Sequence, residues 1–312
     1  MFKVLIADAM DSIAEKILLS KKIEVDVKTD LSEQQLLDQI HVYDGLIVRS
    51  ATKVTSEVIS KGKNIKIIGR AGAGVDNIDL VAAKNNNIIV MNTPGGNTNA
   101  TAEYTLALLL SLSRKVPEAN SSTHQGLWAK KKLKGNEIRG KKIGIIGFGN
   151  VGKRFAEICN ALGLKVFVHS KVFEKIKNDY HNYKSLDFNQ ILKECDIISF
   201  HCKPRTDGSS LIGAKEFENI KKNVLIINTA RGNLVSEEYL LDALKNKKIR
   251  GAALDVFNEE PAKDNLLFGQ DNLILTPHIA ASTSEAQIIV AEMIANQFAE
   301  YFLEGNVSNT VT

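Results

Sequence analysis

An apolar strand that runs directly into a glycine loop lies almost at the middle of this 312-residue chain. The segment reads Lys142-Ile-Gly-Ile-Ile-Gly-Phe-Gly-Asn-Val-Gly152, so that Gly147, Gly149 and Gly152 have the spacing G-x-G-x-x-G before a helical pattern. In such a loop the first glycine allows the tight turn, the second lets the backbone approach a pyrophosphate, and the third lets helix and strand pack closely. The positive N-terminus of the helix then receives the phosphates. The segment predicts a dinucleotide site, and the long stretch before it must form another domain.

Short apolar runs alternate with helical patterns along the whole chain. Strands are predicted at Val4–Ala7, Ile23–Val27, Gly45–Val48, Ile65–Ile68 and Ile88–Met91, with helices near 11–20, 33–40, 55–61 and 78–85. The alternation restarts at Ile143–Ile146, with strands near Val166–His169, Ile197–His201, Val224–Asn228, Gly251–Asp255 and Leu273–Thr276. Such a pattern is typical of parallel sheets covered by helices on both faces. The chain is therefore expected to be an α/β protein with two doubly wound domains.

Two turn-rich segments set the expected domain boundaries. Pro94-Gly95-Gly96 precedes a predicted helix over 100–114 and would act as a hinge. Ser282-Thr-Ser-Glu285 has the spacing of a capping box before a long helix that would stop at Gly305. One face of that helix would be shared by Ile288, Ala291, Ala295, Phe298 and Phe302. We expect the helix to cross back to the first unit, which gives one domain of residues 1–95 plus 286–312, a second domain of residues 96–285, and a cleft between them.

Composition argues against several other classes of protein. Hydrophobic residues make up 44% of the chain, yet no apolar run approaches the ~20 residues that a membrane span needs. The chain has 40 Lys and Arg against 36 Asp and Glu, without a long basic stretch, so no nucleic-acid partner is expected. Cys159, Cys195 and Cys202 lack paired spacing, which predicts neither a disulfide nor a metal site. Because Phe2–Ala7 already has the pattern of a strand, we expect no signal peptide and a cytoplasmic location.

Three polar side chains follow the carboxyl ends of predicted strands in the second half of the chain. Arg231 follows the strand that ends at Asn228, Glu260 follows the next strand, and His278 follows the last one. In an open α/β sheet the carboxyl ends of the strands share one edge, where ligands bind. We therefore expect Arg231, Glu260 and His278 to converge beside a bound dinucleotide.

Six segments of the chain together resemble the D-isomer-specific 2-hydroxyacid dehydrogenases. They are Val48-Arg-Ser-Ala-Thr-Lys-Val54, Gly69-Arg-Ala-Gly-Ala-Gly-Val-Asp-Asn77, Asn92-Thr-Pro-Gly-Gly-Asn97, the glycine loop, Asn228-Thr-Ala-Arg-Gly-Asn-Leu234 and Asp255–Pro261. The resemblance covers essentially the whole chain. It implies a Rossmann-type cofactor domain inserted into a flavodoxin-like substrate domain, Arg231, Glu260 and His278 as catalytic residues, and a homodimer formed largely through the cofactor domain. Trp128 matches a tryptophan that lies near the partner subunit in relatives.

The three side chains suit the oxidation of a 2-hydroxy acid. A base must take the hydroxyl proton as hydride leaves the carbon, which is a task that an imidazole suits, and it is assigned to His278. A neighbouring carboxylate, Glu260, would orient the ring and favour its protonated form. The Arg231 guanidinium would bind the substrate carboxylate in two places and stabilise charge on the adjacent carbonyl oxygen. The hydride chemistry itself belongs to the nicotinamide.

The resemblance also implies contacts to the cofactor and to the substrate. Cofactor contacts are expected at Gly147, Gly149, Asn150, Val151, Gly152, Ser170, Lys171, His201, Cys202, Thr229, Ala230, Arg231, Asp255, His278 and Ala280. Substrate contacts are expected at Arg49, Ala73, Gly74, Arg231 and His278. In this set Arg49 would hold a substrate phosphate, and the loop Ala71–Val75 would offer backbone N–H groups to the substrate carboxylate. Further candidates for the phosphate are Lys53, Arg70 and Lys130–Lys132.

One position departs from the pattern of NAD-binding relatives. An acidic residue about 20 residues beyond the glycines normally hydrogen-bonds the adenosine ribose, but Val166-Phe-Val-His-Ser-Lys171 has Ser170 at this place. Without that carboxylate a 2′-phosphate is not repelled, and Lys171 could attract it. Lys203 and Arg205 add positive charge after the next strand. NAD is the expected cofactor because of the overall resemblance, and NADP stays open as an alternative.

The expected reaction is the oxidation of D-3-phosphoglycerate by NAD to 3-phosphohydroxypyruvate, at the entry to serine synthesis. Two alternatives stay open. One is an NADPH-dependent reductase of hydroxypyruvate or glyoxylate, or another D-2-hydroxyacid dehydrogenase. The other is a binding protein that senses dinucleotides without turnover. Longer relatives carry a C-terminal regulatory domain that binds serine; since this sequence ends at Thr312, soon after the crossing helix, no feedback through such a domain is expected.

Overall fold

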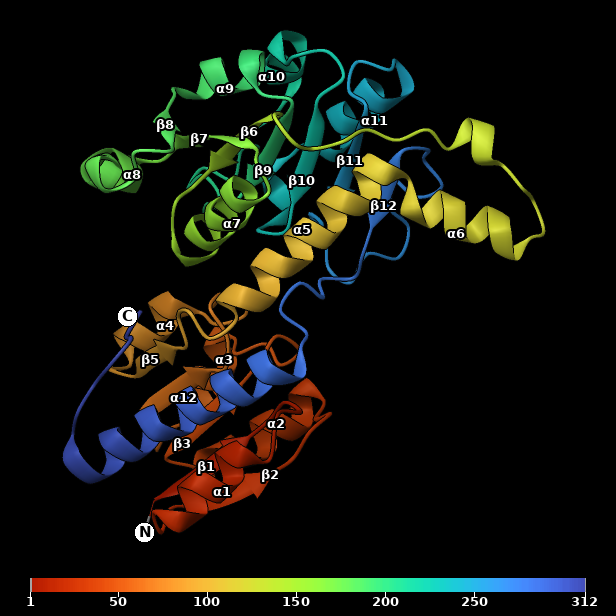
Figure 1. Cartoon of the computed structure of the whole chain (residues 1–312). Coiled ribbons are helices and arrows are strands. Elements are labelled where there is room, and N and C mark those ends of the chain that lie inside the picture. Colours follow the sequence, from red (N-terminus) through yellow and green to blue (C-terminus); the bar gives the residue numbers. More distant parts are fainter. Residues whose placement is uncertain (1, 312) are drawn as a thin grey trace. The chain divides into compact units, whose positions relative to one another are not determined.

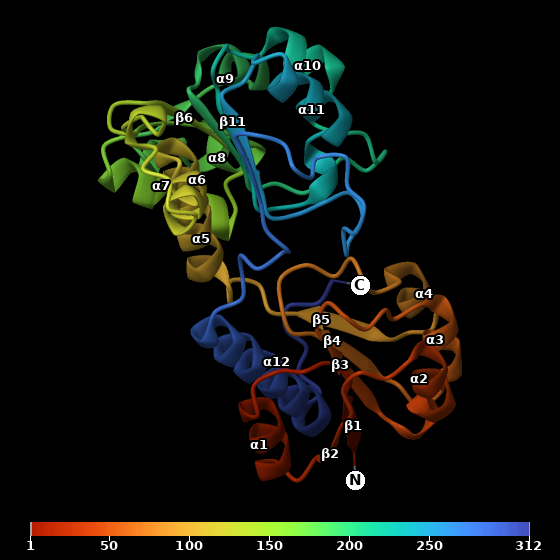
Figure 2. The same ribbon diagram turned by 90° about the vertical axis from the view of Figure 1, so that its right-hand side faces the viewer.

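The computed structural model describes residues 2–311 and divides the chain into two compact units. Unit 1 comprises the residues up to Asn97 together with those from Ser282 onward, and unit 2 comprises Thr98–Ala281. Each unit contains one parallel sheet with helices on its faces (Figures 1 and 2). The chain leaves unit 1 once and returns to it, so the predicted insertion of one α/β domain into another is confirmed.

The sheet of unit 1 has five parallel strands in the order β2-β1-β3-β4-β5. The strands are β1 (Lys3–Ile6), β2 (Glu24–Val27), β3 (Gly45–Val48), β4 (Ile67–Arg70) and β5 (Ile89–Asn92). They are connected by α1 (Ile13–Ser20), α2 (Glu33–Gln39), the 3₁₀ turn η1 (Ile40–Val42), α3 (Ser56–Lys61) and α4 (Leu80–Asn85). This is the flavodoxin-like order, which reverses between β1 and β3. Side chains that follow β1, β3 and β4 therefore lie at one edge of the sheet.

The long helix α12 (Ser284–Glu304) covers one face of this sheet beside α1. Its cap is Thr283, whose hydroxyl oxygen accepts a hydrogen bond from the Ala286 N–H at 3.1 Å. The predicted capping box at Ser282 is therefore wrong by one residue. The helix ends at Gly305 as predicted, with φ 73°.

Four of the five residues predicted to share the apolar face of α12 are buried: Ala291, Ala295, Phe298 and Phe302. Ile288, in the second turn, is 39% exposed, so the buried stripe begins later than predicted.

Two features of unit 1 differ from the sequence-based expectation. β4 begins at Ile67, two residues later than predicted, because Ile65 lies in a turn and donates its N–H to the Gly62 carbonyl at 2.9 Å. The side chain of Ile65 is nevertheless buried, which explains why the apolar pattern included this residue in the predicted strand. In addition, Thr310 forms an antiparallel bridge with Met91 at the edge strand β5, a pairing for which the sequence carries no short-range signal.

The sheet of unit 2 has seven parallel strands in the order β12-β11-β10-β9-β6-β7-β8. The strands are β6 (Lys142–Ile146), β7 (Lys165–His169), β8 (Lys184–Ser185), β9 (Ile197–Phe200), β10 (Leu225–Asn228), β11 (Gly251–Leu254) and β12 (Leu273–Leu275). Counted from β6, this is the Rossmann order with one further strand beyond its sixth. The order reverses at β6, between β7 and β9, which places the ligand crevice of this fold at the carboxyl ends of β6 and its neighbours.

Helices cover both faces of this seven-stranded sheet. One face packs against α5 (Thr98–Arg114), α7 (Asn150–Ala161) and α8 (Lys171–Ile176), and the other packs against α9 (Phe188–Glu194), α10 (Ala214–Asn219) and α11 (Glu237–Lys245). The remaining short elements are α6 (Val116–His124) and the 3₁₀ turns η2 (Lys130–Lys132), η3 (Lys177–Asp179) and η4 (Gly232–Leu234). Because both faces are covered, β9, β10 and β11 are buried at every position. Among residues 2–311, no helix combines the length and the hydropathy that crossing a bilayer would require.

Candidate active site

The glycine loop connects β6 to α7 and lies close to the end of β9. Gly147 has φ 96°, and a Cβ added there would lie 2.4 Å from the His201 carbonyl oxygen. A Cβ on Gly152 would lie 2.3 Å from the Gly147 carbonyl oxygen, whereas a Cβ on Gly149 would meet nothing within 4 Å. Packing therefore requires the first and third glycines, and the second borders open space. This is the arrangement that fits a pyrophosphate.

The N-terminus of α7 is free to bind an anion. Gly149 is its N-cap and forms no side-chain capping hydrogen bond, and the first turn contains no acidic residue. The first backbone N–H groups of a helix lack intrahelical partners and carry partial positive charge. Gly149 and Asn150 are both exposed. The loop and this helix end thus provide the donors that a dinucleotide phosphate needs.

His201 and Cys202 follow β9 on the other side of the glycine loop. The His201 N–H donates to the Ile146 carbonyl at 2.7 Å, and its Nε2 lies 2.9 Å from the Ser199 hydroxyl oxygen. Burial lowers the pKa of His201 to about 3, so that the ring is neutral at pH 7. Burial raises the pKa of the Cys202 thiol to about 11. Neither side chain therefore brings a charge to this end of the sheet.

The loops that follow β10, β11 and β12 bring Arg231, Glu260 and His278 to the same sheet edge. His278 Nδ1 lies 2.6 Å from Glu260 Oε2. Glu260 Oε1 also accepts the N–H of Phe257 at 3.0 Å. Because Glu260 occupies Nδ1, the other ring nitrogen of His278, Nε2, is the one that can exchange a proton with a substrate.

The surroundings of Glu260 keep its carboxyl group ionised. Burial alone would raise its pKa, but the hydrogen bond with His278, the N–H of Phe257 and the charges of His278 and Arg231 outweigh burial and lower the pKa below 4.5. Since the pKa is lowered on folding, the ionised carboxylate stabilises the native state above about pH 4.5 and loses this effect as the pH falls through the lowered value. An ionised Glu260 in turn favours the imidazolium that forms when His278 takes up a proton.

Asn228, at the end of β10, fixes the turn that carries Arg231. Its Nδ2 donates to the Arg231 carbonyl at 2.8 Å, and its Oδ1 accepts the Ala230 N–H at 3.1 Å. Arg231 Nη1 donates to the Ala230 carbonyl at 2.7 Å. Asn228 is buried. The sequence analysis did not single it out, although a polar residue at the end of an otherwise apolar buried strand is a usable signal.

Asp255 lies beneath the loop that carries His278, and its side chain is 0% exposed. The carboxylate accepts the Thr276 hydroxyl at 2.6 Å and the backbone N–H groups of Ile279 at 3.0 Å and Ala280 at 2.8 Å. The His278 N–H donates to the Asp255 carbonyl at 2.8 Å. Burial raises the pKa of Asp255, although these hydrogen bonds and the His278 charge act in the opposite direction.

Four expected cofactor contacts are buried in the structure: Gly152, Thr229, Asp255 and Ala280. Asp255 and Ala280 are bound to each other, and the Thr229 hydroxyl lies 2.8 Å from the Thr105 hydroxyl. These hydrogen bonds position the segments that carry Arg231 and His278, and the cofactor contacts of these residues stay a prediction.

In unit 1, Asp8 fixes the backbone of Arg49 at the end of β3. The buried Asp8 carboxylate accepts the Arg49 N–H at 2.6 Å and the Thr52 hydroxyl at 2.6 Å. Arg49 Nη1 donates to the Ala9 carbonyl at 3.0 Å. The guanidinium is therefore held at the carboxyl edge of the five-stranded sheet.

The loop after β4 lies next to Arg49, since the Ala71 N–H donates to the Val48 carbonyl at 2.9 Å. The Ala73 carbonyl accepts Asn92 Nδ2 at 2.6 Å. Ala73 is exposed and Gly74 is half-buried. The loop thus carries its expected ligand-binding backbone at the same edge as Arg49.

Ser170 follows β7 and caps α8, where its hydroxyl oxygen accepts the Val172 N–H at 3.2 Å. Lys171 beside it is exposed. The one acidic residue within 165–176 is Glu174, whose carboxylate binds the Ser185 hydroxyl and, at 3.1 Å, Lys177. These two partners lower the pKa of Glu174. The strand end that would face an adenosine ribose therefore carries a hydroxyl and an ammonium group in place of a carboxylate.

Comparisons with known proteins agree with this geometry. The family model for the NAD-binding domain of D-isomer specific 2-hydroxyacid dehydrogenases matches residues 106–280, more than half of the chain and all within unit 2. The chain is 44% identical to the D-3-phosphoglycerate dehydrogenase of Archaeoglobus fulgidus over 94% of this chain and 56% of that protein. The chain thus spans little more than half the length of the curated relatives it matches.

Two solved structures with bound cofactors are similar over the full chain. The NAD⁺-bound 3-phosphoglycerate dehydrogenase of Entamoeba histolytica is 29% identical with a TM-score of 0.84, and the match covers 100% of this chain and 98% of that one. An acyclic imino acid reductase in complex with NADPH and D-Arg is 30% identical with a TM-score of 0.88, and the match covers 100% of both chains.

Replacing Gly152 by Ala is expected to weaken dinucleotide binding about tenfold or more, because the new Cβ would collide with the Gly147 carbonyl and separate α7 from β6. The dissociation constant of the reduced dinucleotide, measured by its fluorescence, checks this. Gly213→Ala is the matched control in unit 2, since the nearest atom to a Cβ there is 3.7 Å away. Equal affinities of the two variants would contradict the packing argument.

Proposed function

Because the chain belongs to the family of D-isomer-specific 2-hydroxyacid dehydrogenases, we propose that it is a D-3-phosphoglycerate dehydrogenase. It would transfer hydride from C2 of D-3-phosphoglycerate to a nicotinamide cofactor and give 3-phosphohydroxypyruvate. The observation that carries the proposal is the 2.6 Å pair of His278 and Glu260 beside Arg231, at the sheet edge that also holds the glycine loop. The similarity to curated D-3-phosphoglycerate dehydrogenases supports the choice of substrate.

His278 is the proposed base. Glu260 holds Nδ1, so Nε2 takes the hydroxyl proton of the substrate. The imidazolium that forms is stabilised by the ionised Glu260 carboxylate, and in the reverse direction His278 returns the proton to the carbonyl oxygen. The nicotinamide, when bound, accepts or supplies the hydride.

Arg231 and three residues of unit 1 are proposed to bind the substrate. The Arg231 guanidinium would bind the substrate carboxylate and stabilise charge on the C2 oxygen. Backbone N–H groups of Ala73 and Gly74 would bind the same carboxylate, and Arg49 would bind the phosphate. A doubly charged phosphate needs such a fixed cation, and Arg49 is fixed by Asp8 and by the Ala9 carbonyl.

The proposed cofactor is NAD, held by the glycine loop and the N-terminus of α7. A second candidate function, an NADPH-dependent reductase of hydroxypyruvate or glyoxylate, is favoured by one observation: Ser170 and the exposed Lys171 at the end of β7. The absence of a carboxylate there removes the repulsion of a 2′-phosphate. The similarity to a reductase solved with NADPH is compatible with this second candidate.

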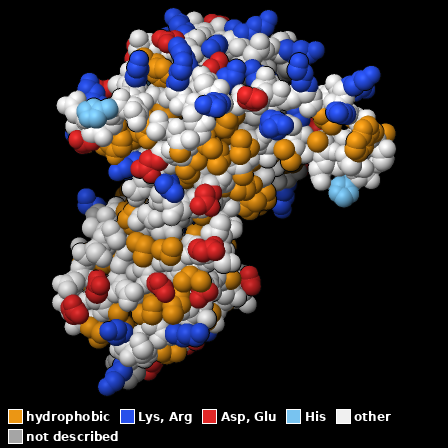
Figure 3. Space-filling model, viewed as in Figure 1, with side chains coloured by type: hydrophobic (Ala, Val, Ile, Leu, Met, Phe, Trp, Pro, Cys, Tyr) orange, Lys and Arg blue, Asp and Glu red, His pale blue; other side chains and the backbone are white. Residues whose placement is uncertain are grey.

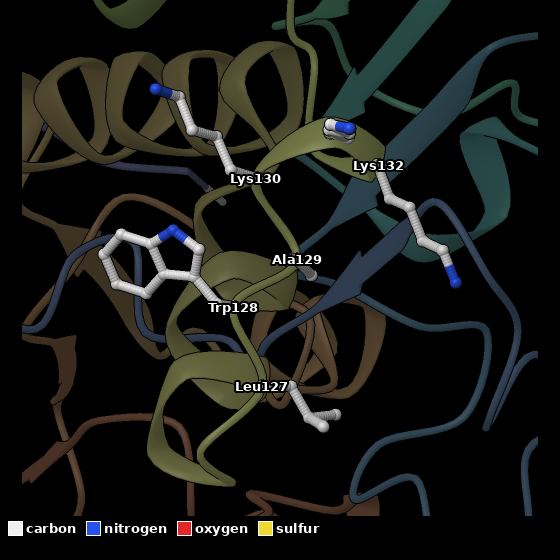
Figure 4. A pocket seen from close by; sticks show the side chains of 6 residues that line it. Leu127, Trp128, Ala129, Lys130 and Lys132 are labelled. Atoms are coloured by element: carbon white, nitrogen blue, oxygen red, sulfur yellow. The ribbon is translucent and has the colours of Figure 1, made fainter.

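We further propose a homodimer formed through an arm of unit 2, residues 116–134. Its helix α6 has no buried residue, and Val116, Leu127 and Trp128 are exposed, Trp128 by 85%. Figure 3 shows hydrophobic side chains at the surface along α5 and again on the arm. A cavity of about 540 Å³ is lined by Leu127, Trp128, Ala129 and Lys130–Lys132, and Figure 4 shows the indole of Trp128 pointing away from the backbone that carries it. An exposed tryptophan on an extended arm is typical of a surface that a partner buries.

Arg49→Ala is expected to raise the KM for 3-phosphohydroxypyruvate about tenfold or more and to leave turnover of hydroxypyruvate unchanged, because only the first substrate carries the phosphate. Oxidation of the reduced dinucleotide, followed by absorbance, measures both. Lys63→Ala, a loss of positive charge at an exposed site in the same unit, is the control. If the wild type prefers hydroxypyruvate or glyoxylate, the phosphoglycerate proposal is wrong and the reductase is favoured.

Ser170→Asp is expected to lower kcat/KM for NADPH about tenfold or more while NADH is used at least as well as before, since the new carboxylate repels a 2′-phosphate and binds a ribose hydroxyl. Asn178→Asp, at an exposed position of η3 beside α8, adds the same charge nearby and serves as the control. Unchanged use of NADPH by Ser170→Asp would mean that the adenosine ribose does not lie at this strand end.

Trp128→Ala is expected to shift the protein from dimer to monomer at micromolar concentration, because truncating a buried tryptophan at an interface commonly costs about 2 kcal/mol or more. Sedimentation velocity of both proteins gives the result. Val81→Ala removes another exposed hydrophobic side chain, in unit 1, and should sediment as the wild type. A wild-type monomer, or a variant that remains dimeric, would refute the arm as the interface.

A further inference from the structure

Glu237, the first residue of α11, has a buried carboxylate. Its exposed fraction is 7%, whereas Glu238 beside it is exposed. Oε1 of Glu237 accepts the backbone N–H of Asn258 at 2.9 Å, and Oε2 accepts the side-chain Nδ2 of Asn265 at 2.8 Å. Removing a carboxylate from water is costly unless such donors compensate. Glu237 thus binds two points of the chain that lie on either side of Glu260.

The segment that carries Glu260 lies at the surface. It belongs to residues 255–272, which connect β11 to β12, and most residues from 258 to 266 are exposed. An exposed connection of this length has few packing contacts that could fix a side chain. Hydrogen bonds to the buried Glu237 supply this constraint, two residues before Glu260 and five residues after it.

Asn258 adjoins the backbone group that orients the Glu260 carboxylate. The preceding residue, Phe257, donates its N–H to Glu260 Oε1 at 3.0 Å, and Glu260 Oε2 lies 2.6 Å from His278 Nδ1. The bond from Asn258 to Glu237 fixes the chain one residue from this point. A displacement of Asn258 would therefore move the oxygen that Glu260 presents to the ring.

Both partners of Glu237 are donors. Asn265 Oδ1 already accepts the Leu267 N–H at 2.9 Å, so Nδ2 is the group that faces Oε2 of Glu237. The backbone N–H of Asn258 is likewise a donor. A carboxylate offers acceptors only, whereas the amide of a glutamine offers one acceptor oxygen and one donor nitrogen. An acid at position 237 therefore satisfies both partners, and a glutamine satisfies one.

We propose that Glu237 is a positioning residue for Glu260, the partner of the catalytic base. It holds the connection between β11 and β12 at two points and so determines where the Glu260 carboxylate meets His278. The inference rests on the proposed function, in which His278 is the base and Glu260 orients its ring. The loss of these bonds would release the segment around Glu260 while β11 and β12 stay paired in the sheet.

Glu237→Gln tests the proposal, with Glu238→Gln as the matched control. Both substitutions remove one negative charge from the first turn of α11, but Glu238 is exposed. Glu237→Gln places a donor opposite Asn265 Nδ2 and is expected to lower kcat about tenfold, while the dissociation constant of the dinucleotide stays within about twofold. Glu238→Gln is expected to behave as the wild type. A wild-type kcat in Glu237→Gln would overturn the proposal.

Asn265→Asp combined with Glu237→Gln tests the bond itself. The new carboxylate can accept both the glutamine amide and the Leu267 N–H, so the double variant restores the hydrogen bonds of the wild type. It is expected to regain kcat to within about threefold of the wild type. Asn265→Asp alone sets two carboxylates against each other and is expected to lower kcat at least as far as Glu237→Gln. A double variant no better than the single ones would contradict the proposal.

A second cycle shows whether Glu237 acts through Glu260. Glu237→Gln combined with Glu260→Gln is expected to lose no more kcat than Glu260→Gln alone, whereas a general loss of structure would make the two losses multiply. Multiplied losses therefore argue against positioning. Should Glu237→Gln not fold, Asn265→Ala replaces it in this cycle, because it removes one bond and keeps Glu237; by itself it is expected to lower kcat about threefold to tenfold.

A readout without turnover separates this inference from the proposed function. With carbon-13 in the six histidines, the His278 resonance, assigned by its loss in His278→Asn, is expected to shift in Glu237→Gln, to return when Asn265→Asp is added, and to stay in place in Glu238→Gln. If the wild type turns over no 2-oxo acid, the proposed function fails, and these spectra still decide the inference. A His278 resonance that is the same in Glu237→Gln as in the wild type overturns the inference whatever the activity.

Discussion

The parallel direction of all strands in unit 2 is the constraint on which the candidate site depends. Since every strand of the seven-stranded sheet runs the same way, residues far apart in sequence meet at one edge as soon as each follows a strand. The glycine loop follows β6, and the residues Arg231, Glu260 and His278 follow β10, β11 and β12. The reversal of strand order at β6 opens this edge to a ligand. Site and fold are thus consequences of the same topology.

Buried polar groups give this edge its fixed geometry. Asn228 holds the turn of Arg231, and Asp255 holds the loop of His278, in each case through backbone hydrogen bonds made by a side chain with little or no exposure. A buried carboxylate without partners would be costly, and the three donors around Asp255 offset that cost only while the loop keeps its conformation. In unit 1, Asp8 fixes Arg49 in the same manner. Both units therefore use a buried acid to position an exposed functional side chain.

Much of the fold and the membership of the candidate site could be predicted from the sequence, because both depend on local patterns. Apolar runs marked every strand of the sheets except the two-residue β8, and strand ends marked Arg231, Glu260 and His278. One error arose because a buried residue need not belong to a strand: Ile65 is buried but lies in a turn. A second error was the cap of α12, which is Thr283, one residue after the predicted Ser282. The bridge between Thr310 and Met91 joins segments with no local signal for each other. The complete burial of Asp255 was likewise not predicted, since the sequence shows residue type and not burial.

The sequence by itself determined the two α/β units, the dinucleotide loop and the residues that follow strand ends, because hydrophobic period, glycine spacing and turn residues act over a few positions. Only the tertiary structure decided which nitrogen of His278 is free, which of the polar residues support the catalytic loops, and that Thr229 meets Thr105. These facts depend on distances between groups that lie up to 124 residues apart in the sequence. The strength of a hydrogen bond depends on tenths of an ångström in distance and on the direction of the donated proton. The packing of the folded chain sets this distance and this direction.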